Sequence, residues 1–373
     1  MKNKPKIAWV TADYFIDCDI DIINGLLDRY NIDWFIILPR NNARYNETQI
    51  KNVINNSVNL HFIYDASRFR SIRKIKFYYS LCKRIEKIRS DVTYINMQGF
   101  PYLFFIASFF LKRRKTIFTV HQSVVHGGMK YKKLTSIYFK LLYSWFSYFH
   151  LYSESQAKSF REKYSNKNIF IIPLGLKSFG EKPKTNLRNK IVFLNFGTIL
   201  KNKNIKSLIL ASNNLYEKGY SNFTTKIVGH CDNWEEYSQL IKYPQVFDLN
   251  INAISNQEIP ELFSSVDYLV LPYSQVSQSG PLKIAFNYNV PVIASDLDEF
   301  KYEIENDYSG YLFECNNISS LTDVLAKAIN NYSYEYENLR KGQKQLVDER
   351  YSGDIILSKY IETFNFVLNA EKN

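Results

Sequence analysis

The sequence has few of the residues that build metal centres, disulfide frameworks or secretion signals. Its 373 residues include four cysteines without a CxxC pair and five histidines that form no metal-ligand spacing with them. We therefore expect reduced thiols and no bound metal. The start, MKNKPKIAWVTAD, is basic but has no apolar core adequate for a signal peptide. These absences predict a cytoplasmic protein.

Long apolar runs are also missing. The most apolar uncharged run, residues 101–111, is shorter than the roughly 20 residues that a helix needs to cross a bilayer. Hydrophobic residues still make up 46% of the chain, which excludes a disordered protein. At this length two domains are the natural expectation.

Positive charge is concentrated in the first half. Residues 1–180 hold 29 basic and 12 acidic residues, a net charge of +17. The rest holds 19 of the 48 basic and 24 of the 36 acidic residues, a net charge of −5. This asymmetry predicts that the first half faces a polyanionic surface.

Residues 68–89 form the most basic stretch, with nine basic residues, one Glu and apolar residues at helical spacing. A solvated helix face is one interpretation, and a peripheral site for an anionic membrane is the other. Residues 101–115 and 130–149 repeat the combination of basic and aromatic residues. No helix-turn-helix, zinc-finger or RNA-binding motif is present, so we expect no nucleic acid partner.

The stretch from 269 to 296, LVLPYSQVSQSGPLKIAFNYNVPVIASD, organises the second half. It consists of an apolar strand, a polar turn, an apolar-periodic helix and a second apolar strand, which predicts a parallel βαβ unit. The turn contains Ser279, Gly280 and Pro281 at the start of the helix. Free backbone N–H groups and the helix dipole would bind phosphate there, although a plain N-cap explains the turn equally well.

Strands and helices alternate along both halves, as in doubly wound α/β domains. We expect strands at 6–10, 33–38, 59–64, 93–96 and 116–120, and then at 191–196 and 224–229. Asp13, Asp17, Asp19 and Asp21 follow the first strand, where ligands bind in such sheets, but helix capping accounts for at least two of them.

The 269–296 stretch resembles the signature of family 4 glycosyltransferases of the GT-B fold. Pro272, Pro281, the run 290–293 and Ser295-Asp296 match that pattern. Val276 and Ile284 stand where the family has two glutamates, and the loop resembles a branch with Gln-Ser-Gly in place of Gly-Phe-Gly. Backbone amides would then carry more of the donor binding.

The resemblance implies two Rossmann-like doubly wound α/β domains that face a central cleft. Residues 1–175 would form the acceptor-side domain, 176–190 the linker, and 191–353 the nucleotide-sugar domain. The last helix, within 354–373, would pack back on the first domain.

The resemblance also implies site residues. The donor diphosphate would contact Gly197, Thr198, Lys203, Ser279, Gly280 and Leu282, and the nucleoside would lie near Gly229 and Ile259. His121 and Lys203 would be catalytic, and Asp19 and His126 would lie on the acceptor side. For His121 a structural role is the alternative, and for Lys203 that of an ordinary surface lysine.

The expected function is transfer of a sugar from a nucleotide-diphosphate sugar, with no cofactor, to a saccharide acceptor. The basic half favours a lipid-linked acceptor at the inner face of the plasma membrane, in assembly of a surface polysaccharide such as capsule, O-antigen or exopolysaccharide. The resemblance implies retention of configuration. A GT-B epimerase or phosphorylase, and a non-catalytic membrane- or polyanion-binding protein, are the alternatives.

Overall fold

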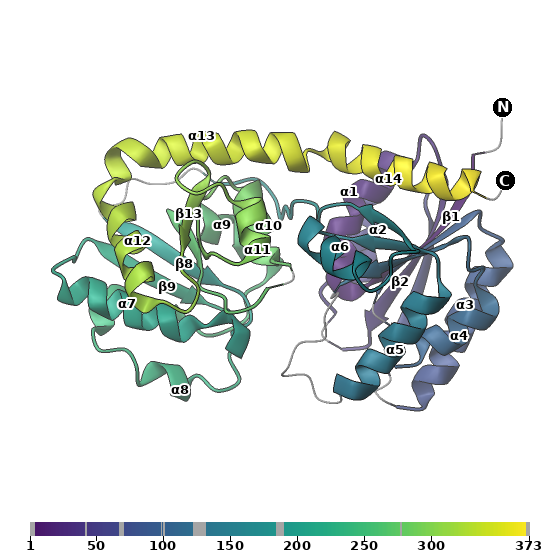
Figure 1. Ribbon diagram of the computed structural model, residues 1–373, viewed down its shortest axis with the longest axis horizontal. Helices are drawn as coiled ribbons and strands as arrows, with labels where there is room; N and C mark the ends of the chain where they lie inside the picture. The colour runs from purple at the N-terminus through teal and green to yellow at the C-terminus, as the bar shows by residue number, and fades with distance from the viewer. Residues whose placement is uncertain are drawn as a thin grey trace. The chain divides into compact units, whose positions relative to one another are not determined.

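The computed structural model describes residues 4–41, 43–66, 71–97, 99, 101–121, 132–183, 190–276 and 278–370 (Figure 1). The chain divides into two compact units. Unit 1 comprises Met1–Gly175 and Gly353–Asn373, and unit 2 comprises Leu176–Ser352.

Unit 1 is built on a seven-stranded parallel sheet with the order β3-β2-β1-β4-β5-β6-β7. Its central strands are almost wholly buried apolar runs, as expected for a parallel sheet covered on both faces. The strands are β1 (Lys6–Ala12), β2 (Asn31–Pro39), β3 (Asn59–Asp65), β4 (Val92–Asn96), β5 (Thr116–Val120), β6 (Tyr148–Leu151) and β7 (Asn168–Ile171).

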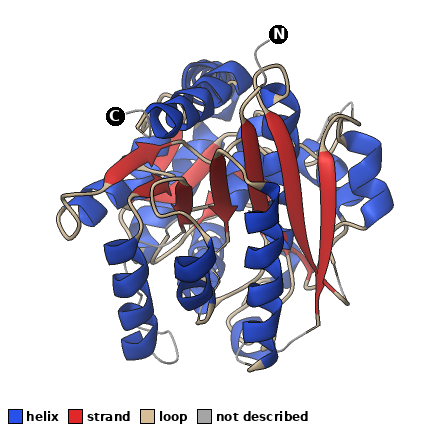
Figure 2. Ribbon diagram, turned by 90° about the vertical axis from the view of Figure 1, so that its right-hand side faces the viewer, coloured by secondary structure: helices blue, strands red, loops and turns tan. Residues whose placement is uncertain are grey.

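Helices pack on both faces of this sheet (Figure 2). One face carries α3 (Arg73–Ile88), α4 (Leu103–Phe110), α5 (Lys132–Trp145) and α6 (Glu154–Arg161). The other carries α1 (Ile16–Leu26), α2 (Glu47–Val53) and α14 (Gly353–Asn369). A short 3₁₀ turn, η1 (Asp13–Phe15), precedes α1.

The last helix, α14, completes the core of unit 1. Tyr360 and Phe364 are 3% and 0% exposed and pack on Trp9, with ring centroids 5.3 and 6.0 Å from it. The chain therefore leaves unit 1 at Gly175, forms unit 2, and returns to finish the first core.

Unit 2 repeats the architecture with six parallel strands in the order β10-β9-β8-β11-β12-β13. Its strands are β8 (Ile191–Phe196), β9 (Phe223–Val228), β10 (Phe247–Asn250), β11 (Tyr268–Leu271), β12 (Val292–Ser295) and β13 (Gly310–Phe313). Its helices are α7 (Ile205–Glu217), α8 (Glu235–Ser238), α9 (Ile259–Ser264), α10 (Gly280–Asn287), α11 (Asp298–Glu303), α12 (Ile318–Asn330) and α13 (Tyr332–Tyr351). Three 3₁₀ turns complete the unit: η2 (Lys201–Lys203), η3 (Pro244–Val246) and η4 (Asn256–Glu258).

Residues 176–183, part of the segment expected as a linker, form no helix or strand and lie with unit 2. The Phe179 N–H donates a hydrogen bond of 3.0 Å to the Tyr288 hydroxyl, which ties the segment to the end of α10. The rest of the expected linker, 184–189, lies outside the described residues.

Both sheets reverse their strand order at one point, between β1 and β4 in unit 1 and between β8 and β11 in unit 2. The prediction of two Rossmann-like, doubly wound sheets is confirmed. Ligands of such sheets bind at the carboxyl ends of the two strands that flank the reversal. Among the described helices, none is long and apolar enough to cross a membrane.

Candidate functional site

Two glycines lie close together beside the reversal point of unit 2. Gly197 follows β8 with φ +112°, and Gly229 follows β9 with φ +152°. A Cβ on Gly229 would lie 2.0 Å from the Gly197 carbonyl oxygen, so the two loops approach at a distance that only glycine allows. The expected diphosphate residue Gly197 and the expected nucleoside residue Gly229 are therefore neighbours.

The start of α10 lies beside Gly197. A Cβ on Gly197 would meet the Pro281 ring at 3.5 Å. Ser279 is the N-cap of α10, and its Oγ accepts a hydrogen bond of 3.3 Å from the Leu282 N–H. Within the described residues the N–H groups of Ser279 and Gly280 have no such acceptor, whereas the Leu282 amide, also expected at the diphosphate, is already used by the cap.

Lys203 is held beside this turn by an aromatic ring. Its Nζ lies 3.7 Å from the centroid of Tyr273, a cation–π contact. Tyr273 follows β11 and is 1% exposed. Asn202, next to Lys203, accepts a hydrogen bond of 2.9 Å from the Ser274 N–H, which joins the loops after β8 and β11. A lysine cation and the amides of the α10 turn thus lie on adjoining loops, while the Thr198 side chain is exposed.

Lys177 was missed by sequence reasoning. It is 8% exposed, and its Cε lies 3.8 Å from where a Gly280 Cβ would be. No sequence signal could have identified it, because the two residues lie about 100 positions apart and no motif includes it. A second lysine therefore lies against the turn, close to the expected diphosphate residues.

Apolar residues occupy the positions of the two family glutamates. Ile284 is 4% exposed in the core of unit 2, and Val276 packs against the same core. Ile259, an expected nucleoside residue, belongs to that core as well, together with Leu282.

At the end of β12, Asp296 accepts a hydrogen bond of 2.9 Å from the Cys315 N–H. That bond lowers the pKa of its carboxyl, and Lys301 lies 3.2 Å away.

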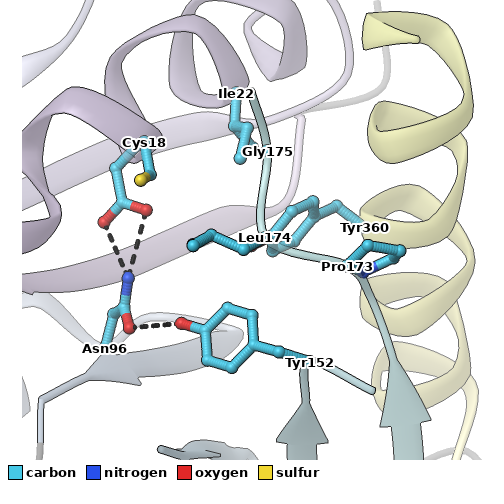
Figure 3. Close-up of a pocket in the computed structure, with 9 residues that line it drawn as sticks. Cys18, Ile22, Asn96, Tyr152, Pro173, Leu174, Gly175 and Tyr360 are labelled. Carbon is cyan, nitrogen blue, oxygen red and sulfur yellow. Dashed lines mark hydrogen bonds between the residues drawn. The ribbon is translucent and has the colours of Figure 1, made fainter. Parts of the chain in front are cut away.

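In unit 1, Asp19 lies at the other reversal point. It is 1% exposed, and its Oδ2 accepts hydrogen bonds from Trp9 Nε1 (2.9 Å) and Thr11 Oγ1 (2.6 Å). Asn96 Nδ2 donates to both carboxylate oxygens at 3.1 and 3.2 Å, and its own Oδ1 accepts a bond of 2.9 Å from the Tyr152 hydroxyl (Figure 3). Burial raises the pKa of Asp19 to about 6, against these hydrogen bonds.

Asp19 borders a small pocket that is also lined by Asn96, Tyr152, Leu174 and Tyr360 (Figure 3). The pocket is closer in size to a water molecule than to a sugar ring. The Asp19 carboxylate is therefore bound by protein donors below the surface. Its expected place near the acceptor stays a prediction.

His121 follows β5 and is 8% exposed, stacked on Phe15 with centroids 4.6 Å apart. Thr119 Oγ1 donates to the Ile95 carbonyl, so it accepts the 2.9 Å bond from His121 Nε2–H. Nδ1 is then an unprotonated acceptor, and it is buried without a partner in the described part of the chain. Burial lowers the pKa of His121 to about 3, with His150 adding to the effect, so the ring is neutral at neutral pH. His126 lies outside the described residues.

Comparison with known proteins links this geometry to a chemistry. The family model for glycosyl transferases group 1 matches residues 178–346, which include the loops of the unit 2 site. No curated protein sequence gives a significant match to the chain.

Solved structures resemble the whole chain. A glycosyltransferase from Rickettsia africae has a TM-score of 0.74 at 16% identity, covering 98% of this chain and 99% of its own. Sucrose-phosphate synthase from Thermosynechococcus elongatus has a TM-score of 0.77 at 12% identity, covering 98% and 100%. Anabaena HepE in complex with UDP and glucose has a TM-score of 0.72 at 14% identity, covering 97% and 100%.

At these identities the structures show the GT-B fold, and the family match adds the chemistry. The chain has the GT-B fold, and residues 178–346, somewhat under half of it, match the model for glycosyl transferases group 1, which supports a glycosyltransferase enzyme.

Proposed function

We propose that the protein moves a sugar from a nucleoside-diphosphate sugar to a saccharide acceptor, with retention of the anomeric configuration. The observation that carries the proposal is the cluster at the β8–β11 reversal point. There, two close glycines, the Ser279 and Gly280 amides, which have no acceptor among the described residues, and the Lys203 cation lie on neighbouring loops. The HepE complex with UDP and glucose supports a donor of this chemical class.

The proposed chemistry requires stabilisation of a departing diphosphate. The bond between the sugar C1 and the phosphate oxygen breaks, a bond from C1 to an acceptor oxygen forms, and the acceptor proton passes to the diphosphate. Backbone amides and the Lys203 ammonium would stabilise the charge that develops on the leaving group. The apolar Val276 and Ile284 supply no carboxylate to hold the donor at the family positions, so backbone amides would carry more of the donor binding. A transfer in which the diphosphate takes the acceptor proton needs no protein nucleophile.

His121 has a role in this proposal that needs no charge. Its unprotonated Nδ1 can accept a hydrogen bond from a sugar hydroxyl, which a protonated ring could not do. We assign His121 to positioning of the transferred sugar, as the resemblance to family 4 glycosyltransferases implies.

The proposed acceptor is a lipid-linked saccharide at the inner face of the plasma membrane, in assembly of a surface polysaccharide. The net charge of +17 over residues 1–180 supports an anionic membrane as the surface at which the enzyme acts.

A donor screen with purified protein tests the proposal, with Lys203→Ala as the diagnostic variant. Because Lys203 would act on the charge of the leaving group, we expect kcat to fall about 100-fold or more while the melting temperature stays near that of the wild type. Lys206→Ala, an exposed lysine on α7, is the matched control and should keep its rate.

Two results would refute the proposal. One is that no nucleoside diphosphate shifts thermal unfolding of the wild type. The other is that every donor sugar is converted only to an epimer, or phosphorolysed, with no transfer to any acceptor. An unchanged rate in Lys203→Ala would remove Lys203 from the site.

A further inference from the structure

Exposed apolar side chains concentrate on three helices of unit 1. Of the eighteen exposed large hydrophobic residues in the described part of the chain, nine lie between 72 and 145, a fifth of the sequence. Phe109 is 85% exposed and Ile72 is 77% exposed, values far above those of a surface side chain that packs on its neighbours. We call these nine residues the α3–α5 face: Ile72, Ile75, Tyr79, Phe105, Phe109, Leu134, Ile137, Leu141 and Trp145.

Helix periodicity places these residues in stripes. On α5, Leu134, Ile137, Leu141 and Trp145 follow the spacing i, i+3, i+7 and i+11, so they share one side of the helix. A different set on the same helix, including Tyr138, Leu142 and Tyr143, is buried in the sheet core. Helix α5 is therefore apolar on its core side and on a second, exposed side, which core packing does not explain.

The three helices are neighbours on the same face of the sheet. Figure 1 shows α3, α4 and α5 side by side, and their buried residues belong to one core cluster. Tyr79 of α3 packs edge-on against Phe110 of α4 at 5.3 Å, and Phe105 of α4 contacts Tyr138 of α5 at 6.4 Å. The exposed stripes thus lie on adjacent helices of one side of unit 1.

Basic residues accompany the apolar ones in the sequence, and two of them contact exposed aromatic rings. Residues 66–145 contain 17 basic and two acidic residues. Lys83 lies 5.5 Å from the Tyr79 ring, and Arg113 lies 6.0 Å from the Trp145 ring. The exposed basic residues of these helices and of the loops that follow them are Arg73, Lys76, Lys83, Arg84, Lys87, Arg89, Lys112, Arg113, Arg114, Lys133 and Lys140.

We propose that the α3–α5 face binds the surface of an anionic phospholipid bilayer. Such a bilayer offers phosphate charge to the lysines and arginines and an apolar layer to Phe109 and its neighbours. A soluble polyanion offers only the charge and would leave the apolar stripes in water. Aromatic rings beside cations, as in the Arg113–Trp145 pair, are typical of side chains at the headgroup level.

The face extends toward the acceptor side of unit 1. Helices that follow parallel strands begin at the carboxyl edge of the sheet, and Ile72, Ile75, Phe105, Leu134 and Ile137 lie at or near the starts of α3, α4 and α5. Asp19 and His121 mark the same edge. Bilayer binding by this face would bring the carboxyl edge of the unit 1 sheet close to a lipid-linked acceptor. The inference therefore rests on the proposed function, in which the acceptor is lipid-linked.

Flotation of the full chain with vesicles tests the inference. The probe is phosphatidylcholine with about 30% phosphatidylglycerol, against phosphatidylcholine alone, at low and high salt. We expect binding to the anionic vesicles that weakens with salt. The double variant Phe109→Ser with Ile137→Ser should lower the partition coefficient at least tenfold, and so should Lys76→Glu with Lys83→Glu.

Matched controls lie elsewhere on the molecule. Val53→Ser with Phe366→Ser removes two exposed apolar residues from the helices on the opposite face of the same sheet. Lys341→Glu with Lys344→Glu reverses two exposed lysines on α13 in unit 2. Both controls should bind vesicles as the wild type does.

Tryptophan fluorescence gives a second readout that does not depend on a destabilising variant. Trp145 is 45% exposed, whereas Trp9 and Trp34 are fully buried. Brominated lipid in the anionic vesicles should quench part of the emission of the wild type, and that part should be absent in Trp145→Phe.

Equal binding to neutral and anionic vesicles, or wild-type binding by both double variants of the face, would overturn the inference. Binding to polyphosphate without binding to vesicles would show a polyanion site instead. Transfer to a soluble acceptor is measured in parallel. Its survival when vesicle binding fails would contradict only this inference, and its failure when vesicle binding persists would contradict only the proposed function.

Discussion

Single side chains in this protein owe their chemistry to neighbours that are distant in sequence. Asp19 could be singled out from the sequence because it follows the first strand. Its donor Asn96, 77 residues away, could not be predicted, because only the pairing of β1 with β4 brings it to Asp19. Trp9 and Thr11 are nearer in sequence, but the turn from β1 into α1 directs their donors to the carboxylate. Lys177 beside Gly280 is a similar case. The sequence can therefore indicate which residue is a candidate, but the partners of its side chain depend on the tertiary structure.

The burial of Asp19 predicts a pH dependence of stability. Its folded pKa of about 6 lies above the ordinary value of 3.8, so the folded chain binds this proton more tightly than the unfolded chain. Stability from this group is therefore greatest below about pH 4 and is lost as the pH rises through about 6, by up to about 3 kcal/mol. In Asp19→Asn this contribution should vanish.

Urea unfolding of wild type and Asp19→Asn at about pH 4.5 and pH 7 measures the effect, because the difference between the two proteins cancels most other titrating groups. We expect the wild type to lose stability relative to the variant at the higher pH. A difference that is the same at both pH values would show that Asp19 titrates as an ordinary carboxyl.

At the scale of single elements, local sequence patterns predict the positions of several strands and helices correctly. The strand β11, the capped turn and helix α10 appear where the sequence predicts them, because Ser279 and Pro281 mark the helix start in any context. The cap also engages the Leu282 amide through the Ser279 hydroxyl, and the expected contact of that amide with a diphosphate stays a prediction. Strand β10 was not expected, since Phe247–Asn250 is short and partly exposed and so lacks the apolar pattern of the central strands.

The contact between the loops after β8 and β9 gives an element-scale prediction. Gly229→Ala would place a Cβ 2.0 Å from the Gly197 carbonyl oxygen, so the two loops must separate. We expect unit 2 to lose more than about 2 kcal/mol of stability, and nucleoside-diphosphate binding to weaken sharply. Differential scanning calorimetry and a thermal-shift titration with UDP measure the two effects.

Gly219→Ala is the matched control. Gly219 also has a positive φ, +93°, but nothing lies within 4 Å of its Cβ position. It should show only the backbone strain, about 1 kcal/mol, with donor binding retained. If Gly229→Ala binds UDP as the control does, the close approach of the two loops is not needed for the donor site.

At the scale of the whole molecule, the alternation of strands and helices along both halves predicts the two doubly wound sheets that the structure has. The α3–α5 face was only partly readable, because the sequence shows basic and aromatic residues together but not which aromatics are buried. Tyr138 and Trp145 are both aromatic residues of the stretch 130–149, yet Tyr138 is 2% exposed and Trp145 is 45% exposed. Exposure depends on which side of α5 meets the sheet.

The return of the chain into unit 1 leads to a last prediction. Phe364 of α14 is fully buried against Trp9 and Tyr94, so Phe364→Ala should destabilise unit 1 by about 3–5 kcal/mol. Unit 2 has its own cores, so UDP should still raise the temperature of its transition. Phe366→Ala, which removes a side chain that is 48% exposed, is the control and should leave unit 1 nearly unchanged. If Phe364→Ala lowered both transitions equally and abolished the shift by UDP, the two units would unfold as one, and α14 would stabilise the donor domain as much as its own.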